Sequence, residues 1–113
     1  MEIIKVLKDT VQDIDLPMQV EEVYLLKNQL DIVGYGFINY DSSNEIEMFI
    51  KEDYRGEENG KLLFKKLYKD FKKGTIRLEI DINNYPMLKI VEEFGGTNLG
   101  AFEGKESYVI KKN

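Results

Sequence analysis

The chain has 113 residues, of which 42% are hydrophobic and 33% charged, and its formal net charge is −5. This length suits one globular domain over residues 1–113, and no run approaches the roughly 20 apolar residues that span a membrane. The negative charge argues against a general nucleic-acid binder, because Lys and Arg contacts to phosphates supply most of that affinity.

Cysteine and histidine are both absent. Their absence excludes disulfides, a thiolate nucleophile, Ser-His-Asp catalysis and the usual zinc ligand sets, so we expect no metal site. The remaining chemistry must use carboxylates, Tyr, Lys, backbone amides or a cofactor that carries its own activated group. Acyl transfer from a thioester satisfies this restriction.

The N-terminal segment alternates apolar and polar residues over positions 3–7, which predicts a first strand. It lacks the basic start, apolar stretch and cleavage site of a signal peptide, so we expect a cytoplasmic protein with no membrane partner. The polar connection over residues 9–19 contains Pro17 and has room for one helical turn at most.

Three further strands are predicted before the middle of the chain. Residues 22–27 and 31–40 have the pattern of an antiparallel hairpin, and residues 45–51 add a third strand in which apolar and charged side chains alternate. Gly34 and Gly36 indicate a bulge or a close approach of the backbone within the second of these strands.

A helix and a fifth strand follow. Apolar residues recur at three- and four-residue steps between Lys61 and Lys73, which predicts an amphipathic helix, and Gly74 is expected to end it in the left-handed conformation. Alternation resumes over residues 75–82. Because strands 45–51 and 75–82 are joined through a helix, we expect them to lie parallel with a right-handed crossover.

The loop before this helix reads Arg55-Gly56-Glu57-Glu58-Asn59-Gly60. The first turn of a helix leaves about four N–H groups unpaired, so an anion such as a pyrophosphate could complete their hydrogen bonds there. Arg55 and Lys61 would add positive charge. In the alternative interpretation, Glu57 and Glu58 stabilise the helix N-terminus themselves and take the place of a ligand.

The last third of the chain predicts a short helix and a hairpin. Asn84 is a candidate N-cap, Pro86 suits the first turn, and Gly95 with Gly96 ends the helix. Residues 99–102 and 107–111 follow as paired strands. The whole order predicts an α+β fold, with a mixed, mostly antiparallel twisted sheet of six or seven strands, one central parallel βαβ unit, and helices packed on it.

Two separated segments, residues 53–63 and residues 78–95, together resemble the GCN5-related N-acetyltransferase (GNAT) family. Arg55 to Gly60 occupies the place of the family's Gln/Arg-x-x-Gly-x-Gly/Ala cofactor motif. Leu-Glu-Ile-Asp-Ile-Asn-Asn at 78–84, with the helix ending at Phe94-Gly95, is similar to the family's strand, Asn and helix. The resemblance covers roughly residues 22–113 and implies the acyl-CoA N-acyltransferase fold, with the family's first two helices reduced.

The resemblance implies that acetyl-CoA is the co-substrate and that an acceptor primary amine attacks its thioester directly. A base would remove the amine proton, and a Tyr would protonate the departing thiolate. The implied cofactor contacts are the backbone of Phe49, Ile50 and Lys51 for the pantetheine arm, Arg55 and the amides of Gly56, Glu57, Glu58, Asn59, Gly60 and Lys61 for the diphosphate, and Asn84 from the next strand.

Catalytic residues are harder to assign, because the chain departs from the family pattern. Glu58 stands at the family's middle glycine, and Val91 stands where the family has its acid Tyr. Tyr85 is the candidate to replace that acid, although an aromatic residue beside Pro86 also suits packing. The candidate base is Glu47, and the alternatives, each of which also suits a solubilising surface residue, are Glu45, Glu79 and Asp81.

The short connection over residues 9–19 implies an acceptor side that is open. An open side favours a bulky acceptor, such as a protein lysine or N-terminus, or a homodimer in which another subunit completes the site. The sequence is therefore consistent with two functions. One is a small acetyl-CoA-dependent N-acetyltransferase. The other, suggested by Glu57, Glu58 and Val91, is a catalytically silent relative that keeps the fold for protein interaction or ligand sensing.

Overall fold

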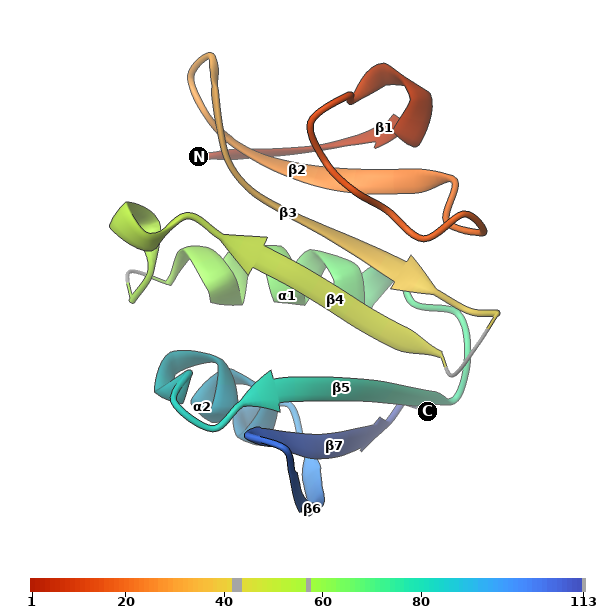
Figure 1. Cartoon of the computed structure of the whole chain (residues 1–113), viewed down its shortest axis with the longest axis vertical. Helices are drawn as coiled ribbons and strands as arrows, with labels where there is room; N and C mark the ends of the chain where they lie inside the picture. Colours follow the sequence, from red (N-terminus) through yellow and green to blue (C-terminus); the bar gives the residue numbers. More distant parts are fainter. Residues whose placement is uncertain (42–43, 57, 113) are drawn as a thin grey trace.

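A seven-stranded mixed sheet forms the body of the protein, in the order β1-β2-β3-β4-β5-β7-β6 (Figure 1). The computed structural model describes residues 1–41, 44–56 and 58–112. Neighbouring strands are antiparallel except β4 and β5, which are parallel. The predicted fold class is therefore confirmed. The strands are β1 Glu2–Leu7, β2 Glu22–Asn28, β3 Asp31–Asn39, β4 Glu45–Ile50, β5 Thr75–Asp81, β6 Thr97–Phe102 and β7 Lys105–Lys111.

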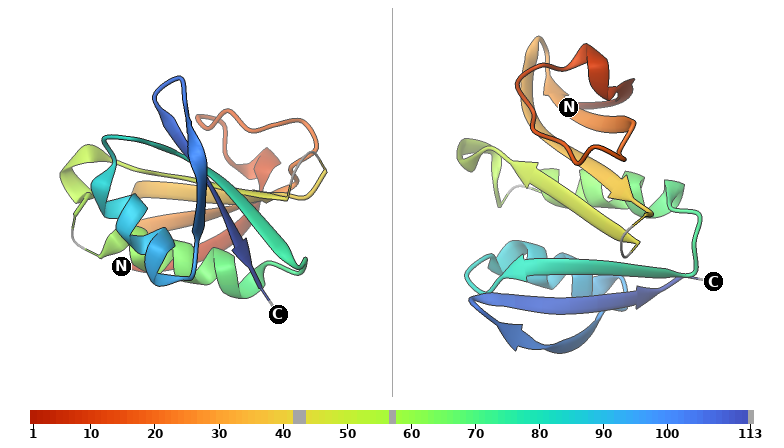
Figure 2. Two further views of the ribbon diagram at one scale, coloured as in Figure 1. Left: turned by 90° about the horizontal axis from the view of Figure 1, so that it is seen from below. Right: turned by 45° about the vertical axis from the view of Figure 1, so that its right-hand side comes forward.

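Helices cover one face of the sheet, and the long connection after β1 covers part of the other (Figures 1 and 2). α1 (Asn59–Asp70) lies across β3 and β4, and α2 (Tyr85–Glu93) lies beside it behind β5. The connection makes one 3₁₀ turn at Lys8–Thr10, in agreement with the prediction of one helical turn at most. It then crosses the opposite face near β2 and β3. Within the described residues, no helix has the length and apolar character needed to cross a membrane.

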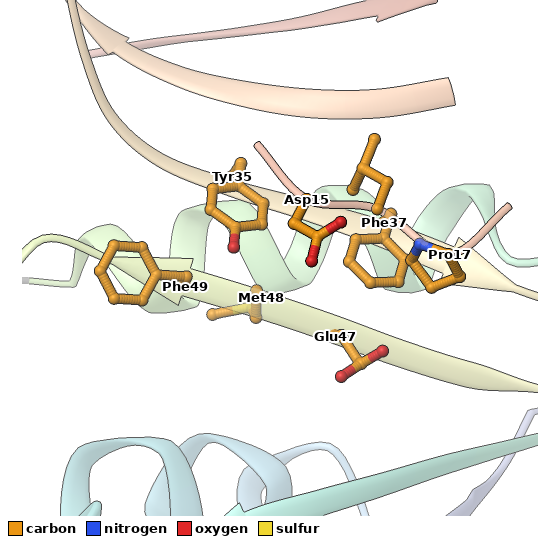
Figure 3. Close-up of a pocket in the computed structure, with 8 residues that line it drawn as sticks. Asp15, Pro17, Tyr35, Phe37, Glu47, Met48 and Phe49 are labelled. Carbon is orange, nitrogen blue, oxygen red and sulfur yellow. The ribbon is translucent and has the colours of Figure 1, made fainter. Parts of the chain in front are cut away.

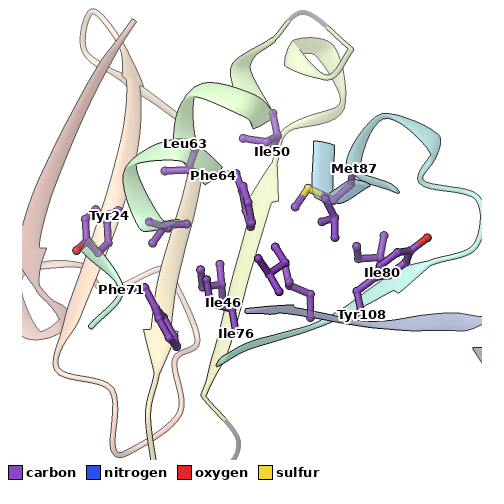
Figure 4. Packing of buried hydrophobic residues seen from close by; sticks show 14 of the residues in the cluster. Tyr24, Ile46, Ile50, Leu63, Phe64, Phe71, Ile76, Ile80, Met87 and Tyr108 are labelled. Atoms are coloured by element: carbon purple, nitrogen blue, oxygen red, sulfur yellow. The ribbon is translucent and has the colours of Figure 1, made fainter. Parts of the chain in front are cut away.

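The main hydrophobic core lies between the sheet and α1 (Figure 4). Leu63, Phe64 and Leu67 of α1 have no exposed surface, and they pack against the inward side chains of β4 and β5. Full burial of one such side chain contributes about 1.5 to 3 kcal/mol. The core therefore fixes β4 relative to the first turns of α1.

α1 differs from its prediction at both ends. It begins at Asn59 rather than Lys61, and it ends at Asp70 rather than Lys73. Gly74 does not have a positive φ, so its prediction as a left-handed cap is wrong.

Tertiary contacts explain the early end of α1. The backbone of Phe71 is extended, at φ −67° and ψ 128°. Its side chain is buried, and its ring centroid lies 5.2 Å from that of Tyr40. Lys112, which follows β7, donates from Nζ to the carbonyls of Tyr68 and Lys69 in the last turn of α1 and to that of Phe71 just after it. A cation at a helix C-terminus is favourable. Local periodicity carries no information about these distant partners.

The ends of α2 agree with the sequence. Asn84 Oδ1 accepts a hydrogen bond from the Met87 amide at 3.3 Å, and Pro86 lies in the first turn. Gly95 follows the helix with φ 85°, the conformation that glycine adopts without steric cost.

Gly34 and Gly36 allow α1 and β4 to approach β3 closely. A Cβ at Gly34 would lie 2.8 Å from the Phe49 carbonyl oxygen, and one at Gly36 would lie 2.6 Å from Leu67 Cδ1. The expected close approach is confirmed, and the pairing of β2 with β3 also shifts register after Leu26.

The parallel strands β4 and β5 diverge. Among the residues that the structure describes, their one register pair is Glu45 and Arg77, and the Arg77 amide donates to the Asn44 carbonyl at 2.9 Å. From that point the strands separate toward their C-terminal ends, which lead into the loop before α1 and into α2 (Figure 1). We call this region the open end of the β4–β5 pair.

Candidate functional site

The loop at the open end keeps a glycine-type backbone. Gly56 has φ 77°, and Glu58, which immediately precedes α1, has φ 65° and ψ 0°. A side chain in this left-handed conformation costs about 1 kcal/mol or more. The backbone of Glu58 therefore adopts the shape expected of glycine even though glycine is absent. Glu57, another predicted contact and the second acid of this loop, lies outside the described residues.

The first turn of α1 presents backbone N–H groups at this loop. The Leu62 amide donates to the Glu58 carbonyl at 2.9 Å, whereas the described part of the chain supplies no acceptor for the amides of Asn59, Gly60 and Lys61. The buried Asn59 side chain donates to the Tyr54 carbonyl at 3.0 Å and holds the turn in place. These three amides can bind an anion, since they lie at the positive end of the helix dipole.

The two cations predicted near this loop already have protein partners. Arg55 Nε donates to the Ile50 carbonyl at 2.6 Å, and its guanidinium lies 5.3 Å from the centroid of the Phe49 ring. Lys61 Nζ lies 2.9 Å from Glu93 Oε2, which joins α1 to α2 and raises the pKa of Lys61. An anion at the loop would compete with Glu93 for this ammonium group.

Strand alternation decides which backbone groups of β4 face the gap. The Lys51 amide donates to the Val33 carbonyl of β3 at 2.8 Å. Because N–H and C=O directions alternate along an antiparallel strand, Phe49 also points toward β3, and Met48 and Ile50 point toward β5. Of the three residues predicted to pair with a pantetheine arm, Ile50 presents its backbone to the gap.

The residues predicted to act from the β5 side lie in three different environments: the open end, the surface and the core. Asn84 lies at the open end, where its side-chain oxygen caps α2. Tyr85 begins α2 and is 70% exposed. Val91, at the position of the family's acid, has no exposed surface and packs close to Gly96. The Val91 position therefore belongs to the core.

A cavity of about 430 Å³ lies on the opposite face of β4 from α1 (Figure 3). Glu47 and Phe49 of β4 line it together with Tyr35 and Phe37 of the neighbouring strand β3. The remaining lining residues are Asp15, Leu16, Pro17 and Met48. We call it the β3–β4 cavity. Its volume lies within the range of small-molecule sites.

The side chains of β4 reach the cavity on one face of the strand and the N-terminus of α1 on the other. Glu47 and Phe49 point into the cavity, whereas Met48 also reaches the helix side, where its Cε would lie 3.6 Å from a Cβ at Gly60. The cavity and the N-terminus of α1 are thus separated by little more than the thickness of one strand.

Glu47 has an electrostatic setting suited to a base. Partial burial raises the pKa of its carboxyl, and the nearby negative charges of Glu45 and Glu79 raise it further, while Lys105 opposes the shift. A carboxylate with a raised pKa holds a proton more readily near neutral pH.

Several cavity residues escape prediction from motifs alone. Tyr35 and Phe37 alternate with Gly34 and Gly36, so the period of two places the aromatic rings on the face away from α1. That signal could have identified them. Asp15 could not be found this way, because its segment has no periodic pattern and reaches β3 only through the tertiary fold.

No protein-family model matches the chain, and no curated protein matches it in sequence. Solved structures nevertheless share its fold. The protein yncA of Salmonella typhimurium, provisionally assigned as an acetyltransferase and solved with its cofactor acetyl-CoA, is 14% identical with a TM-score of 0.68, over 81% of this chain and 65% of that one. The ribosomal-protein-alanine N-acetyltransferase of Brucella melitensis is 15% identical with a TM-score of 0.67, over 80% of this chain and 68% of that one.

A third structure has almost the same length as this chain. It is a Klebsiella pneumoniae protein provisionally assigned as an acyl-CoA N-acyltransferase, 18% identical with a TM-score of 0.68, over 97% of this chain and 96% of that one. The chain spans about two thirds of the length of several other neighbours. Together these likenesses establish the fold, which is that of the GCN5-related N-acetyltransferases.

Proposed function

We propose that this chain binds acetyl-CoA at the open end of the β4–β5 pair and transfers the acetyl group to a primary amine held in the β3–β4 cavity. The observation that carries the proposal is the position of β4. One edge of the strand faces the diverging gap, and Glu47 and Phe49 on the same strand line the cavity. A thioester at the edge near Met48 would therefore lie beside an amine in the cavity.

Acetyl-CoA would supply an activated acetyl group, so the protein has to hold it and to move protons. The amides of Asn59, Gly60 and Lys61 would bind the diphosphate, and Lys61 would exchange Glu93 for a phosphate oxygen. The Ile50 amide and the Met48 backbone suit pairing with the pantetheine arm. Asn84, at the end of α2 nearest the gap, is the contact proposed from the β5 side.

Glu47 would accept the proton of the attacking amine, directly or through one water. As the new C–N bond forms, the C–S bond breaks, and the thiolate takes a proton from an acid. Tyr85 is the donor proposed from the sequence. Tyr35 lines the cavity and is a second candidate. Replacement of each tyrosine by Phe, followed by comparison of turnover, separates the two.

Calorimetric titration with acetyl-CoA tests the proposal. We expect saturable binding to the wild-type protein and tighter binding to Glu58→Gly, because this change removes a negative charge beside the anion site. One solvated charge is worth about 1 kcal/mol at close range, or roughly fivefold in affinity. Glu103→Gly is the matched control, since Glu103 also has a positive φ (51°) but lies in the β6–β7 turn. Its affinity should equal that of the wild type.

A flat titration with both the wild-type protein and Glu58→Gly would refute the proposal. It would favour the second candidate function, a catalytically silent GNAT-like module for protein interaction or ligand sensing. The pairing of Arg55 with Ile50 and of Lys61 with Glu93, and the burial of Val91, are the observations on its side. A cytoplasmic location and a homodimer both stay predictions.

A further inference from the structure

We infer that the β3–β4 cavity selects a small linear amine that carries a second positive charge, such as an aliphatic diamine. This inference rests on the proposed function for the role of the amine as acceptor. It concerns the substrate class, and it is carried by the walls of the cavity, the charges around it and its size.

Carboxylates line the cavity from two separate elements. Asp15 comes from the connection after β1 and lies between the Tyr35 and Phe37 rings in the view of Figure 3, whereas Glu47 comes from β4. Glu79 on β5 lies close enough to disfavour ionisation of Glu47, and Lys105 on β7 is the opposing cation. A dication would relieve this repulsion, whereas a molecule with its own carboxylate would add to it.

Aromatic rings form the rest of the wall. The Tyr35 and Phe49 centroids are 5.7 Å apart, and Phe49 is 44% exposed. The Arg55 guanidinium lies 5.3 Å from the Phe49 ring centroid, a distance at which a cation is attracted to an aromatic ring. Methylene groups also pack favourably against aromatic rings. The walls therefore suit a molecule with positive charges joined by an aliphatic chain.

The connection after β1 borders the cavity on one side, and the expectation of an open acceptor side stays a prediction. Leu16 and Pro17 line the cavity beside Asp15, and Val20 of the same segment is buried. The cavity is open to solvent, with Asp15, Glu47 and Phe49 exposed, and its volume of about 430 Å³ has room for a small linear molecule. One amine would face Glu47 and lose its proton, and the other would stay charged beside Asp15.

The experiment compares three probes of similar length by NMR titration without acetyl-CoA: 1,4-diaminobutane, n-butylamine and 4-aminobutanoate. We expect the diamine to bind about twofold to fivefold more tightly than the monoamine, as one additional solvent-exposed ion pair provides. We expect 4-aminobutanoate to bind more weakly than n-butylamine. Signals of Tyr35, Phe37 and Phe49 should shift.

Variants of the connection separate the cavity from general surface charge. Asp15→Asn should lower diamine affinity to the level of the monoamine and leave the monoamine unchanged. Asp13→Asn should change neither, because Asp13 is exposed like Asp15 but does not line the cavity. The inference would be overturned if the diamine and the monoamine bound equally, or if no amine bound. It would also be overturned if 4-aminobutanoate or a lysine-containing peptide bound more tightly than the diamine. Diamine binding with a flat acetyl-CoA titration would support the inference and refute the proposed function. Saturable acetyl-CoA binding without a preference for the diamine would support the proposed function and overturn the inference.

Discussion

Gly34 is a position at which one added methyl group should be measurably harmful. In Gly34→Ala the new Cβ would lie 2.8 Å from the Phe49 carbonyl oxygen and 2.7 Å from Ile50 Cδ1. The side chain of Ile50 can rotate, but the Phe49 carbonyl belongs to the adjacent strand and cannot withdraw unless β3 and β4 separate. The substitution therefore strains the pair that forms one wall of the β3–β4 cavity.

The size of the effect follows from two opposing contributions. Overpacking of a well-filled site costs about 1 to 3 kcal/mol. The smaller conformational freedom of alanine in the unfolded chain returns about 0.4 to 1 kcal/mol. We expect a net loss of about 1 to 2 kcal/mol in the free energy of unfolding, and hence a Tm lower by roughly 5 to 10 °C.

Urea and thermal unfolding followed by circular dichroism measure this loss. Gly74→Ala is the matched control, because the nearest heavy atom to its Cβ would be the Lys112 carbonyl oxygen at 4.0 Å and its φ is not left-handed. Its stability should be unchanged or slightly higher. If Gly34→Ala unfolds at the same urea concentration as Gly74→Ala, the close approach of β3 and β4 is not a constraint on the native state.

Two other predictions concern charge. Lys112→Met removes the cation that binds two carbonyls of α1 and the Phe71 carbonyl just after it, so the free energy of unfolding should fall by about 0.3 to 1 kcal/mol. Lys111→Met, on exposed β7 surface, is the control, and equal urea midpoints would contradict the capping role. Glu79→Gln should lower the pKa of Glu47 toward its ordinary value, because the charge of Glu79 raises it; carboxyl ¹³C NMR titration measures this, and an unchanged or higher pKa would contradict it.

Local sequence pattern was sufficient for most elements of the fold. Alternation locates β5, with Ile76, Leu78 and Ile80 buried, whereas Ile82, the last residue of the predicted strand, lies just beyond β5 and is exposed. Capping chemistry locates α2, because the Asn84 side chain needs no partner beyond the first turn. Features that depend on residues close in sequence are thus predictable.

Features that depend on distant residues were not predictable. The end of α1 is set by Tyr40 and Lys112, which lie about 30 and 40 residues from Phe71. In the candidate site, Glu47 was foreseen from its strand face, but its partner across the cavity, Asp15, comes from a segment without periodicity. Such positions follow from the tertiary fold rather than from a local rule.

The divergence of β4 and β5 makes folding stability a reporter of ligand binding. In the described part of the chain β4 and β5 share one register pair, so main-chain groups along their inner edges face the gap, and a molecule of the proposed kind would hydrogen-bond to them there. Any occupant that binds only the native state raises the melting temperature in proportion to the logarithm of its concentration. Thermal-shift screening of acyl-CoA compounds can therefore rank occupants of this gap before any chemical reaction is detected.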